Sequence, residues 1–314
     1  MTKFRRIIIL VFILSMMLSV AGCDSDSNTA DAGRPVVDGQ YLASNGETEY
    51  KIVIPENVTS LGEDAFAYCN SLEQVVIGSG SEHLYTLVLS LLGQDKEYAI
   101  ESPSYHKIEQ VYRVSNVPFT MLPLGPEGIE SRALWNCDSD VLHLSPYRSY
   151  PSGVTATASK RHEYIRWAHR EGRYIIEDDY NGELRYTART LPAFQSKIPD
   201  KCIYIGSFSK LLLPSVRIAY MVLPDSLIEV FEEKMQYYNQ TCGKTEQLAL
   251  TEYILSGNLE KHLRRLRRIY YSKNQLMLKS LKRYPDIFKK ITLFETSLIF
   301  EIKTNLTLKK VEKH

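Results

Sequence analysis

Apolar runs and amphipathic stretches alternate from about Val75 to the C-terminus. Runs such as "VLHLSP", "RYIIEDDY", "CIYIGS" and "IAYMVLP" have the length and the β-branched content of buried strands. Stretches such as "EHLYTLVLSLLG" and "ASKRHEYIRWAHREG" predict helices between these strands. The alternation predicts an α/β fold with a mostly parallel sheet that is flanked by helices on both faces.

One long helix is predicted over residues 259–283, because Leu259, Leu263, Leu266 and Tyr270 recur at helical spacing. The same stretch carries a basic cluster, which could contact nucleic acid. The apolar stripe favours a solvated helix face instead. The chain then ends with one strand-like run, "TLFETSLIFEI", and a polar tail.

Residues 1–23 have a different pattern, with a basic start formed by Lys3, Arg5 and Arg6. The apolar stretch "IIILVFILSMMLSV" follows and leads into "VAGC". This stretch is too short to span a membrane comfortably, so it predicts a targeting segment. It resembles a bacterial lipoprotein signal, which implies that Cys23 is lipidated and anchors the protein to a membrane. A plain secretory signal is the alternative.

Residues 24–45 are rich in Asp, Ser, Asn and Gly, and this composition predicts a disordered tether. Residues 46–77, which include "YKIVIPENVTSLGEDAFAYCNSLEQVVIG", alternate short β-branched strands with a turn. This pattern resembles a single BspA-like leucine-rich repeat. A solenoid needs about three stacked repeats to bury its core, so we expect no independent binding surface from this fragment.

The composition adds little to this picture. The chain is 44% hydrophobic and 24% charged with a net charge of +1, which is ordinary for a globular protein and favours no acidic partner. The five cysteines form no CxxC pair, and no histidine lies at metal-ligand spacing from them. We therefore expect no metal site, and we expect the cysteines after Cys23 to be small buried residues.

Candidate chemistry lies in "IGSFSKLLLPSVRIAY", residues 205–220, where Lys210 lies between two serines and Arg217. A protonated lysine is a poor nucleophile, but a lysine can form an imine with the aldehyde of pyridoxal 5′-phosphate, which then acts as an electron sink. Such a site also needs an acid for the pyridine nitrogen, a donor for the phenolate oxygen, a phosphate cup and a flat partner for the ring. A loop with a solvated lysine is the alternative.

Candidates for the other parts of this site occur elsewhere in the chain. "IIEDDY" places Asp178 and Tyr180 two residues apart near the end of an apolar strand, so both side chains point to the same face. Asp178 would pair with the pyridinium, and Tyr180 would donate to the phenolate oxygen. Tyr105, in "ESPSYH", follows a strand-like stretch and could stack on the cofactor ring.

The phosphate cup is predicted from two stretches. "GSGSEHLYTLV" is a Gly-Ser turn that opens a helix, where backbone N–H groups and the positive helix end attract an anion. Serine hydroxyls beside Lys210 add donors, and an arginine binds phosphate in a bidentate way. The predicted cup is formed by Ser79, Gly80, Ser81, Glu82, Ser207, Ser209 and Arg217.

Residues 75 to about 300 resemble the aminotransferase domain of MocR-type GntR-family regulators, within the fold-type I, or class I/II aminotransferase, superfamily. The resemblance lies in "VIGSGSEHL", "YAIESPSYH", "SPYRSYPSG", "YIIEDDYNGELRY", "SFSKLLLPSVRIAYMVLP" and "GNLEKHLRRLRRIYYSKN". It implies that Lys210 is the Schiff-base lysine, Asp178 the pyridine-nitrogen partner and Tyr180 the phenolate-oxygen partner. It also implies the phosphate cup above, a stacking role for Tyr105, and a homodimer.

Several features depart from that family. Arg148 stands where these regulators usually carry a histidine near the phenolate side of the cofactor. No winged-helix domain is present, so we expect no nucleic-acid binding. We expect a large domain that binds pyridoxal 5′-phosphate (PLP) at residues 78–258, and a linking helix with the start of a truncated small domain at 259–314. The arginine that usually grips the substrate carboxylate would lie beyond this point.

The sequence therefore favours a PLP-dependent aminotransferase that acts on an amino acid and a 2-oxo acid. The alternatives are a non-catalytic domain that senses an amino acid, and a surface lipoprotein whose truncated PLP domain is a passenger. The lipoprotein signal predicts membrane anchoring, whereas PLP chemistry suggests the cytoplasm. "LEQVVIGSG" satisfies both the repeat and the PLP pattern, as a natural gene fusion or an error of sequence assembly would produce.

Overall fold

The computed structural model describes the central part of the chain in full and four further strands by their backbone alone. The fully described residues are 75–180, 182–184, 192–213, 215–235 and 240–285. The backbone strands are β1 (Val36–Leu42), β2 (Thr48–Val53), β11 (Phe288–Leu293) and β12 (Phe300–Thr304). The predicted signal segment, with Cys23, lies outside the described residues, as does most of the predicted repeat.

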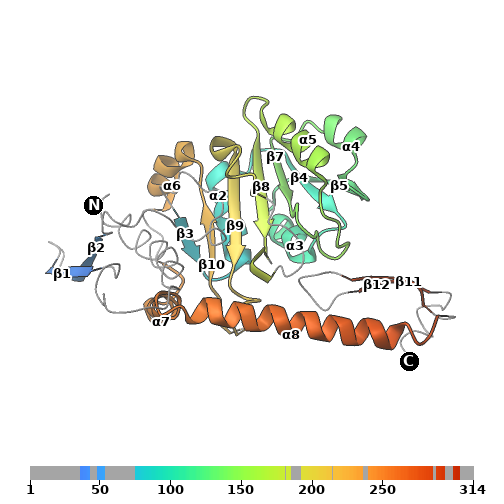
Figure 1. Ribbon diagram of the computed structural model, residues 1–314. Coiled ribbons are helices and arrows are strands. Elements are labelled where there is room, and N and C mark those ends of the chain that lie inside the picture. Colours follow the sequence, from blue (N-terminus) through green and yellow to red (C-terminus); the bar gives the residue numbers. More distant parts are fainter. Residues whose placement is uncertain are drawn as a thin grey trace. The chain divides into compact units, whose positions relative to one another are not determined.

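An eight-stranded mixed sheet, in the order β3-β10-β9-β8-β7-β4-β5-β6, forms the centre of the fold (Figure 1). The pairs between β4, β5, β7, β8 and β9 are all parallel, which confirms the predicted mostly parallel α/β sheet. Its strands are β3 (Val75–Gly78), β4 (Tyr98–Ser102), β5 (Phe119–Gly125), β6 (Gly128–Ile129), β7 (Val141–Leu144), β8 (Tyr174–Asp179), β9 (Cys202–Ser207) and β10 (Ala219–Val222).

Strand β10 is the exception inside this sheet, because it runs antiparallel to both β9 and β3. Residues 208–218 connect β9 to β10, and this connection is too short to carry a crossover helix back to the start of the sheet. The candidate lysine, Lys210, belongs to this connection. The reversal therefore places Lys210 beside the end of β9 instead of on a long crossover.

Helices cover both faces of the sheet. In chain order, the helices that the structure describes are α2 (Ser81–Leu92), α3 (His106–Val114), α4 (Ser131–Trp135), α5 (Ala158–Ala168), α6 (Ile228–Met235), α7 (Lys244–Leu255) and α8 (Asn258–Leu281). Short 3₁₀ turns occur at Gly182–Leu184, Pro199–Lys201 and Asp225–Leu227. No helix among the described residues is long and apolar enough to cross a membrane.

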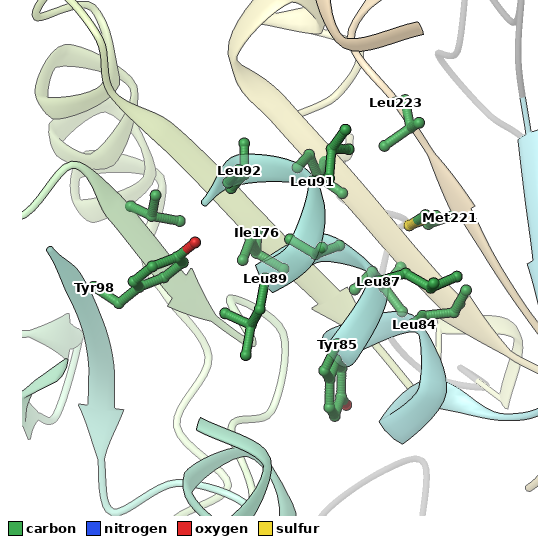
Figure 2. Close-up of a cluster of buried hydrophobic side chains, with 14 of the residues drawn as sticks. Leu84, Tyr85, Leu87, Leu89, Leu91, Leu92, Tyr98, Ile176, Met221 and Leu223 are labelled. Carbon is green, nitrogen blue, oxygen red and sulfur yellow. The ribbon is translucent and has the colours of Figure 1, made fainter. Parts of the chain in front are cut away.

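Two hydrophobic clusters lie on opposite faces of the sheet. Successive residues of β8 separate them, because Ile176 belongs to the cluster beneath α2 and Ile175 to the cluster beneath α5. Figure 2 shows the first cluster, in which Leu84 and Leu89 of α2 pack towards the sheet. Burying a leucine side chain contributes about 1.5–3 kcal/mol, so the apolar face of α2 fixes this helix on the sheet.

The chain divides into two compact units, Met1–Tyr180 with Leu191–Glu260, and Asn181–Thr190 with Lys261–His314. In the second unit, Nε of Arg267 donates to the carbonyl oxygen of Glu183 at 2.8 Å. The unit also holds β11 and β12 as an antiparallel pair, where the sequence predicted one strand-like run. Each strand is short, and both lie close to the span that the apolar pattern covered.

The N-terminal prediction also differs from the structure in one place. β1 and β2 form a separate antiparallel pair, and β1 occupies residues 36–42 of the stretch predicted as a disordered tether. β-branched and aromatic residues within "VVDGQYL" and "TEYKIV" favour strands, although the surrounding composition is polar. Of the cysteines, Cys137, Cys202 and Cys242 are buried free thiols, as expected, and Cys69 lies outside the described residues.

Candidate active site

A cavity of about 320 Å³ opens at the carboxyl ends of β8 and β9, beside the start of α2. Strand ends of this kind are where open α/β sheets bind ligands. Most of the residues singled out in the sequence line this one cavity: Ser81, Glu82, Tyr105, Asp178, Tyr180, Ser207, Ser209, Lys210 and Arg217. Segments far apart in the chain therefore meet at one cavity.

Asp178 lies on β8 and is 3% exposed. The hydroxyl of Tyr85 donates to its Oδ2 at 2.6 Å, while its Oδ1 has no hydrogen-bond partner among the described residues. Burial raises the pKa of Asp178 to about 7, against the opposing effects of the Tyr85 hydrogen bond and the Lys210 charge. A buried acceptor at a cavity wall requires a donor, and a protonated ring nitrogen fits that requirement.

Lys210 is exposed to the cavity, and its Nζ lies 4.2 Å from the ring centroid of Tyr180. Desolvation lowers the pKa of Lys210, and the nearby Asp178 carboxylate acts in the opposite direction. A lower pKa leaves more of the amine unprotonated, which is the form that attacks a carbonyl carbon. Lys210 and Asp178 are thus electrostatically coupled across one cavity.

Tyr180 and Arg148 meet through the main chain. The Tyr180 hydroxyl donates to the carbonyl oxygen of Arg148 at 2.6 Å. Arg148 is buried, has a positive φ of 60°, and places its guanidinium 5.1 Å from the ring centroid of Tyr147. The described residues that line the cavity do not include Arg148. In this structure Arg148 therefore holds Tyr180 through its backbone, and its charge is directed towards Tyr147.

The predicted phosphate cup is assembled around the first turn of α2. Ser81 begins the helix, and Gly80 precedes it with a φ of 95°. A Cβ added to Gly80 would lie 2.5 Å from Nη2 of Arg217, so this glycine allows the guanidinium to approach the helix start closely. Nη2 of Arg217 also pairs with Oε2 of Glu82 at 2.5 Å. Helix N–H groups and one guanidinium thus adjoin, as an anion site requires.

The remaining cup residues come from the end of β9. The Ser207 hydroxyl accepts a hydrogen bond from the backbone N–H of Ser209 at 3.2 Å, and both serines line the cavity. Ser79 and Gly80, which the sequence also proposed, adjoin the cavity in sequence but are not among its lining residues. Their contribution is the backbone turn that opens α2.

Tyr105 lies on the cavity wall directly before α3. Its ring and that of Tyr150 are 6.0 Å apart between centroids and nearly perpendicular, at 79°. Burial raises the pKa of Tyr105, so its hydroxyl stays protonated at neutral pH. Tyr150 lies edge-on beside the ring that the sequence expected to stack on a cofactor.

Sequence reasoning missed three lining residues, Tyr85, Ser145 and Tyr150, and the buried carboxyl behind them, Glu101. Glu101 accepts hydrogen bonds from the Ser149 hydroxyl at 2.6 Å and from the Ser145 N–H at 3.1 Å. Burial raises the pKa of Glu101 to about 8. One signal could have revealed Tyr85: it follows Ser81 by one helical turn, so both share a face of α2.

The comparisons with known proteins first define the class of fold. Fold-type I pyridoxal-phosphate aminotransferases have the same fold. A solved example is LysN, the α-aminoadipate aminotransferase of Thermus thermophilus, complexed with N-(5′-phosphopyridoxyl)-L-leucine. It superimposes with a TM-score of 0.64 and 26% identity, covering 75% of this chain and 63% of that one.

Among curated sequences, the homologues are MocR- and GntR-type regulators and aminotransferases. The uncharacterized HTH-type transcriptional regulator YdeL of Bacillus subtilis is 31% identical over 239 residues, which is 76% of this chain and 51% of the relative. The 2-aminoadipate transaminase of Thermus thermophilus is 29% identical over 221 residues, 67% of this chain and 55% of the relative. The chain spans about half the length of these relatives. No protein-family model matches it.

Proposed function

We propose that the cavity binds pyridoxal 5′-phosphate and that the protein transfers an amino group between an amino acid and a 2-oxo acid. One observation carries the proposal: Asp178 and Lys210 line the same cavity, and the buried Oδ1 of Asp178 has no partner among the described residues. The homologous aminotransferases and the pyridoxal-phosphate fold support it. A carboxylate can pair with the ring nitrogen of that cofactor, and an amine can bond to its aldehyde carbon.

Different residues of the chain would hold the different groups of the cofactor. Oδ1 of Asp178 would accept the ring N–H. The Tyr180 hydroxyl, which here donates to the Arg148 carbonyl, would turn to donate to the phenolate oxygen. The first turn of α2, two serines and Arg217 would hold the phosphate, and Tyr105 would pack against the ring. The phosphate residues are Ser79, Gly80, Ser81 and Glu82, through the turn and the helix start, with Ser207, Ser209 and Arg217.

When bound, the cofactor supplies an electron sink that stabilises the carbanion of an amino acid. Lys210 would attach to the cofactor through Nζ and, after release, move the substrate's α-proton with the same atom. Desolvation lowers the pKa of Lys210, which favours both the attack and the proton removal. An ionised Asp178 beside the ring nitrogen would favour the protonated form of that nitrogen.

The test is spectroscopic. Purified protein mixed with pyridoxal 5′-phosphate should show the visible absorption band of the cofactor bound covalently to lysine, and Lys210→Ala should lack it. Lys197→Ala is the matched control, because Lys197 is an exposed lysine outside the cavity lining, and it should keep the band. A wild-type protein without the band, or a Lys210→Ala variant that retains it, would overturn the proposal.

A second function, sensing of an amino acid without turnover, is favoured by the regulators among the homologues. The two functions are separated by incubating the cofactor-loaded protein with amino acids and assaying for a 2-oxo acid. An aminotransferase releases the 2-oxo acid stoichiometrically in a single half-reaction. A sensor binds the amino acid, as seen by a spectral change, and releases none.

The N-terminal predictions are proposals supported by the sequence alone. Lipidation of Cys23 would anchor the protein to a membrane, ahead of the repeat fragment at 46–77 and the PLP domain. Labelling with a fatty acid should depend on Cys23 and be lost in Cys23→Ser. The homodimer is proposed by resemblance, and sedimentation of the purified protein tests it.

A further inference from the structure

Tyr85 is a polar residue on the otherwise apolar inner face of α2. Its ring is buried among the hydrophobic side chains of that face, with 3% of its surface exposed (Figure 2). Its hydroxyl reaches the cavity and donates to Oδ2 of Asp178 at 2.6 Å. The two residues are 93 positions apart, so only the folded sheet and helix bring them together.

The surroundings of Tyr85 keep it in one position and in one protonation state. Its ring meets the His143 ring edge-on, with centroids 5.1 Å apart, and His143 is in turn hydrogen-bonded to the Tyr112 hydroxyl at 3.0 Å. Burial lowers the pKa of His143 to about 3, so this ring stays neutral. Burial raises the pKa of Tyr85 well above its usual value. Tyr85 therefore keeps its proton at neutral pH and remains able to donate a hydrogen bond.

Asp178 needs such a donor because most of its environment opposes its negative charge. Burial disfavours ionisation, and nearby carboxylates add repulsion, whereas the Tyr85 hydroxyl and the Lys210 amine favour the charged form. The titratable groups that face Asp178 are Tyr85 and Glu82 of α2, Asp179 of β8, Lys210 after β9, Glu101 of β4 and Tyr105 before α3. Among these, Tyr85 makes the direct hydrogen bond to the carboxylate.

We infer that Tyr85 is a positioning residue of the proposed cofactor site: its hydroxyl holds Oδ2 of Asp178, which favours the ionised carboxylate and leaves Oδ1 as the oxygen without a protein donor. The inference rests on the proposed function, because Oδ1 is the atom assigned to the ring nitrogen. A phenylalanine at position 85 would keep the packing against His143 and remove the hydroxyl, which donates to Asp178 and also bonds to the Ser81 side chain. Asp178 would then be held by no side chain on α2.

The variant that tests the inference is Tyr85→Phe, with Tyr112→Phe as the matched control. Tyr112 is equally buried in the same cluster, and its hydroxyl bonds to His143 and not to Asp178. In cofactor-free protein labelled with ¹³C-aspartate, the NMR titration of Asp178, assigned by its loss in Asp178→Asn, should shift upward by about one pH unit in Tyr85→Phe. The shift reflects the loss of a hydrogen bond to a charged group. Tyr112→Phe should titrate as the wild type does.

A second measurement uses the cofactor. Absorbance titration should show that Tyr85→Phe binds pyridoxal 5′-phosphate about tenfold more weakly than the wild type, and that Tyr112→Phe binds it equally well. In the Asp178→Asn background, adding Tyr85→Phe should change the affinity by less than about twofold, since the coupling has been removed.

The outcomes separate this inference from the proposed function. A wild-type protein without the visible band refutes cofactor binding, whereas the NMR titration of cofactor-free protein still decides the role of Tyr85. An unchanged Asp178 titration in Tyr85→Phe overturns the inference. An equal shift in Tyr112→Phe overturns it too, because it would show a general effect of packing.

Discussion

Two neighbouring residues of β8, Glu177 and Asp178, carry buried carboxyls that point to opposite faces of the sheet. Each is 3% exposed, and burial raises the pKa of each to about 7. Oε2 of Glu177 accepts hydrogen bonds from the Phe194 N–H at 2.7 Å and from the Cys202 thiol at 3.8 Å, and the Gln195 N–H adds another. Asp178 receives one bond, from Tyr85, and keeps Oδ1 without a partner among the described residues.

The comparison shows that burial and a raised pKa do not by themselves mark a functional carboxyl. Glu177 is enclosed by protein donors that tie the loop after β8 to the sheet, which is a structural role. Asp178 has the same burial but an incomplete set of donors, and it lies at a cavity. The unfilled hydrogen-bonding capacity is what distinguishes a group arranged for a ligand from a group arranged for the fold.

Removing the Asp178 carboxyl should mainly lower activity, whereas removing the Glu177 carboxyl should mainly lower stability. The loss of activity is the largest effect we expect. Asp178→Ala should lower aminotransferase activity at least about 100-fold, because a fixed charge at the reacting group is lost. Its stability should fall by only about 1 kcal/mol, since one hydroxyl loses its partner. Glu177→Ala should lower stability by about 3 kcal/mol, because several buried donors lose theirs. Activity assays and urea unfolding measure both.

Glu177→Ala also provides the control for this pair. Its folded fraction should bind pyridoxal 5′-phosphate with wild-type affinity and show the same visible band. A loss of the band in folded Glu177→Ala, equal to the loss in Asp178→Ala, would contradict the separation between the two faces.

The pH dependence of stability should reflect the ionisation of the same two carboxyls and of Glu101. The folded-state pKa values of Glu177 and Asp178 are about 7 and that of Glu101 is about 8, all raised above the usual values near 4. Between about pH 4 and pH 8 the unfolded chain releases these protons first, so the free energy of unfolding should fall as the pH rises. Each unit of raised pKa corresponds to about 1.4 kcal/mol.

Adding the cofactor sharpens this prediction. A ring N–H on Asp178 favours its ionised form, so bound pyridoxal 5′-phosphate should remove the contribution of Asp178 to the decline and leave that of Glu177. Urea unfolding from pH 5 to pH 8, with and without cofactor, measures the difference. Glu101→Gln should flatten the decline in both cases. A slope that is identical with and without cofactor would argue against contact between the ring nitrogen and Asp178.

The sequence predicted the parts of the site that depend on local periodicity. The alternation of a strand is strict, so Asp178 and Tyr180 had to share a face, and a Gly-Ser turn before an apolar helix placed Ser81 at a helix start. The resemblance of the ordered motifs to a family then predicted that Lys210 and Arg217 belong to one site. The α/β sheet followed from the alternation of apolar runs and helices.

The parts that escaped prediction depend on long-range pairing. No local pattern states the direction of a strand, so the antiparallel β10 was not foreseen. The bond from Tyr85 to Asp178 joins positions 93 apart, and the bond from Ser149 to Glu101 joins positions 48 apart. Arg148 was expected beside the cofactor from its place in a motif. Its side chain instead lies over Tyr147, at a backbone position with positive φ.

Two glycines with positive φ allow a similar comparison, one beside the cavity and one away from it. Gly80 beside the cavity has a φ of 95°, and Gly128 has a φ of 129° and lies against α5. An alanine at either position would be strained by about 1–2 kcal/mol. Gly80→Ala should also weaken pyridoxal 5′-phosphate binding several-fold, because the new Cβ displaces the Arg217 guanidinium. Gly128→Ala should lower stability alone, since its Cβ would meet Tyr164 and Lys160.

Urea unfolding and absorbance titration of these two variants measure the two effects separately. Equal loss of affinity in both variants would mean that cofactor affinity depends on overall stability and not on the turn before α2. Loss of affinity in Gly80→Ala alone supports the placement of the phosphate at the start of this helix.

The smallest effect is expected from Cys202→Ala, which removes one weak donor from Glu177. Cys202 is fully buried, and its Sγ lies 3.8 Å from Oε2 of that carboxyl. A thiol is a weak donor, and Phe194 still bonds the same oxygen, so the free energy of unfolding should fall by only about 1 kcal/mol, mostly from lost packing. The visible band and the cofactor affinity should not change. A shifted band would show that the charge on Glu177 reaches the ring through β8, and the two faces would then have to be treated as one electrostatic unit.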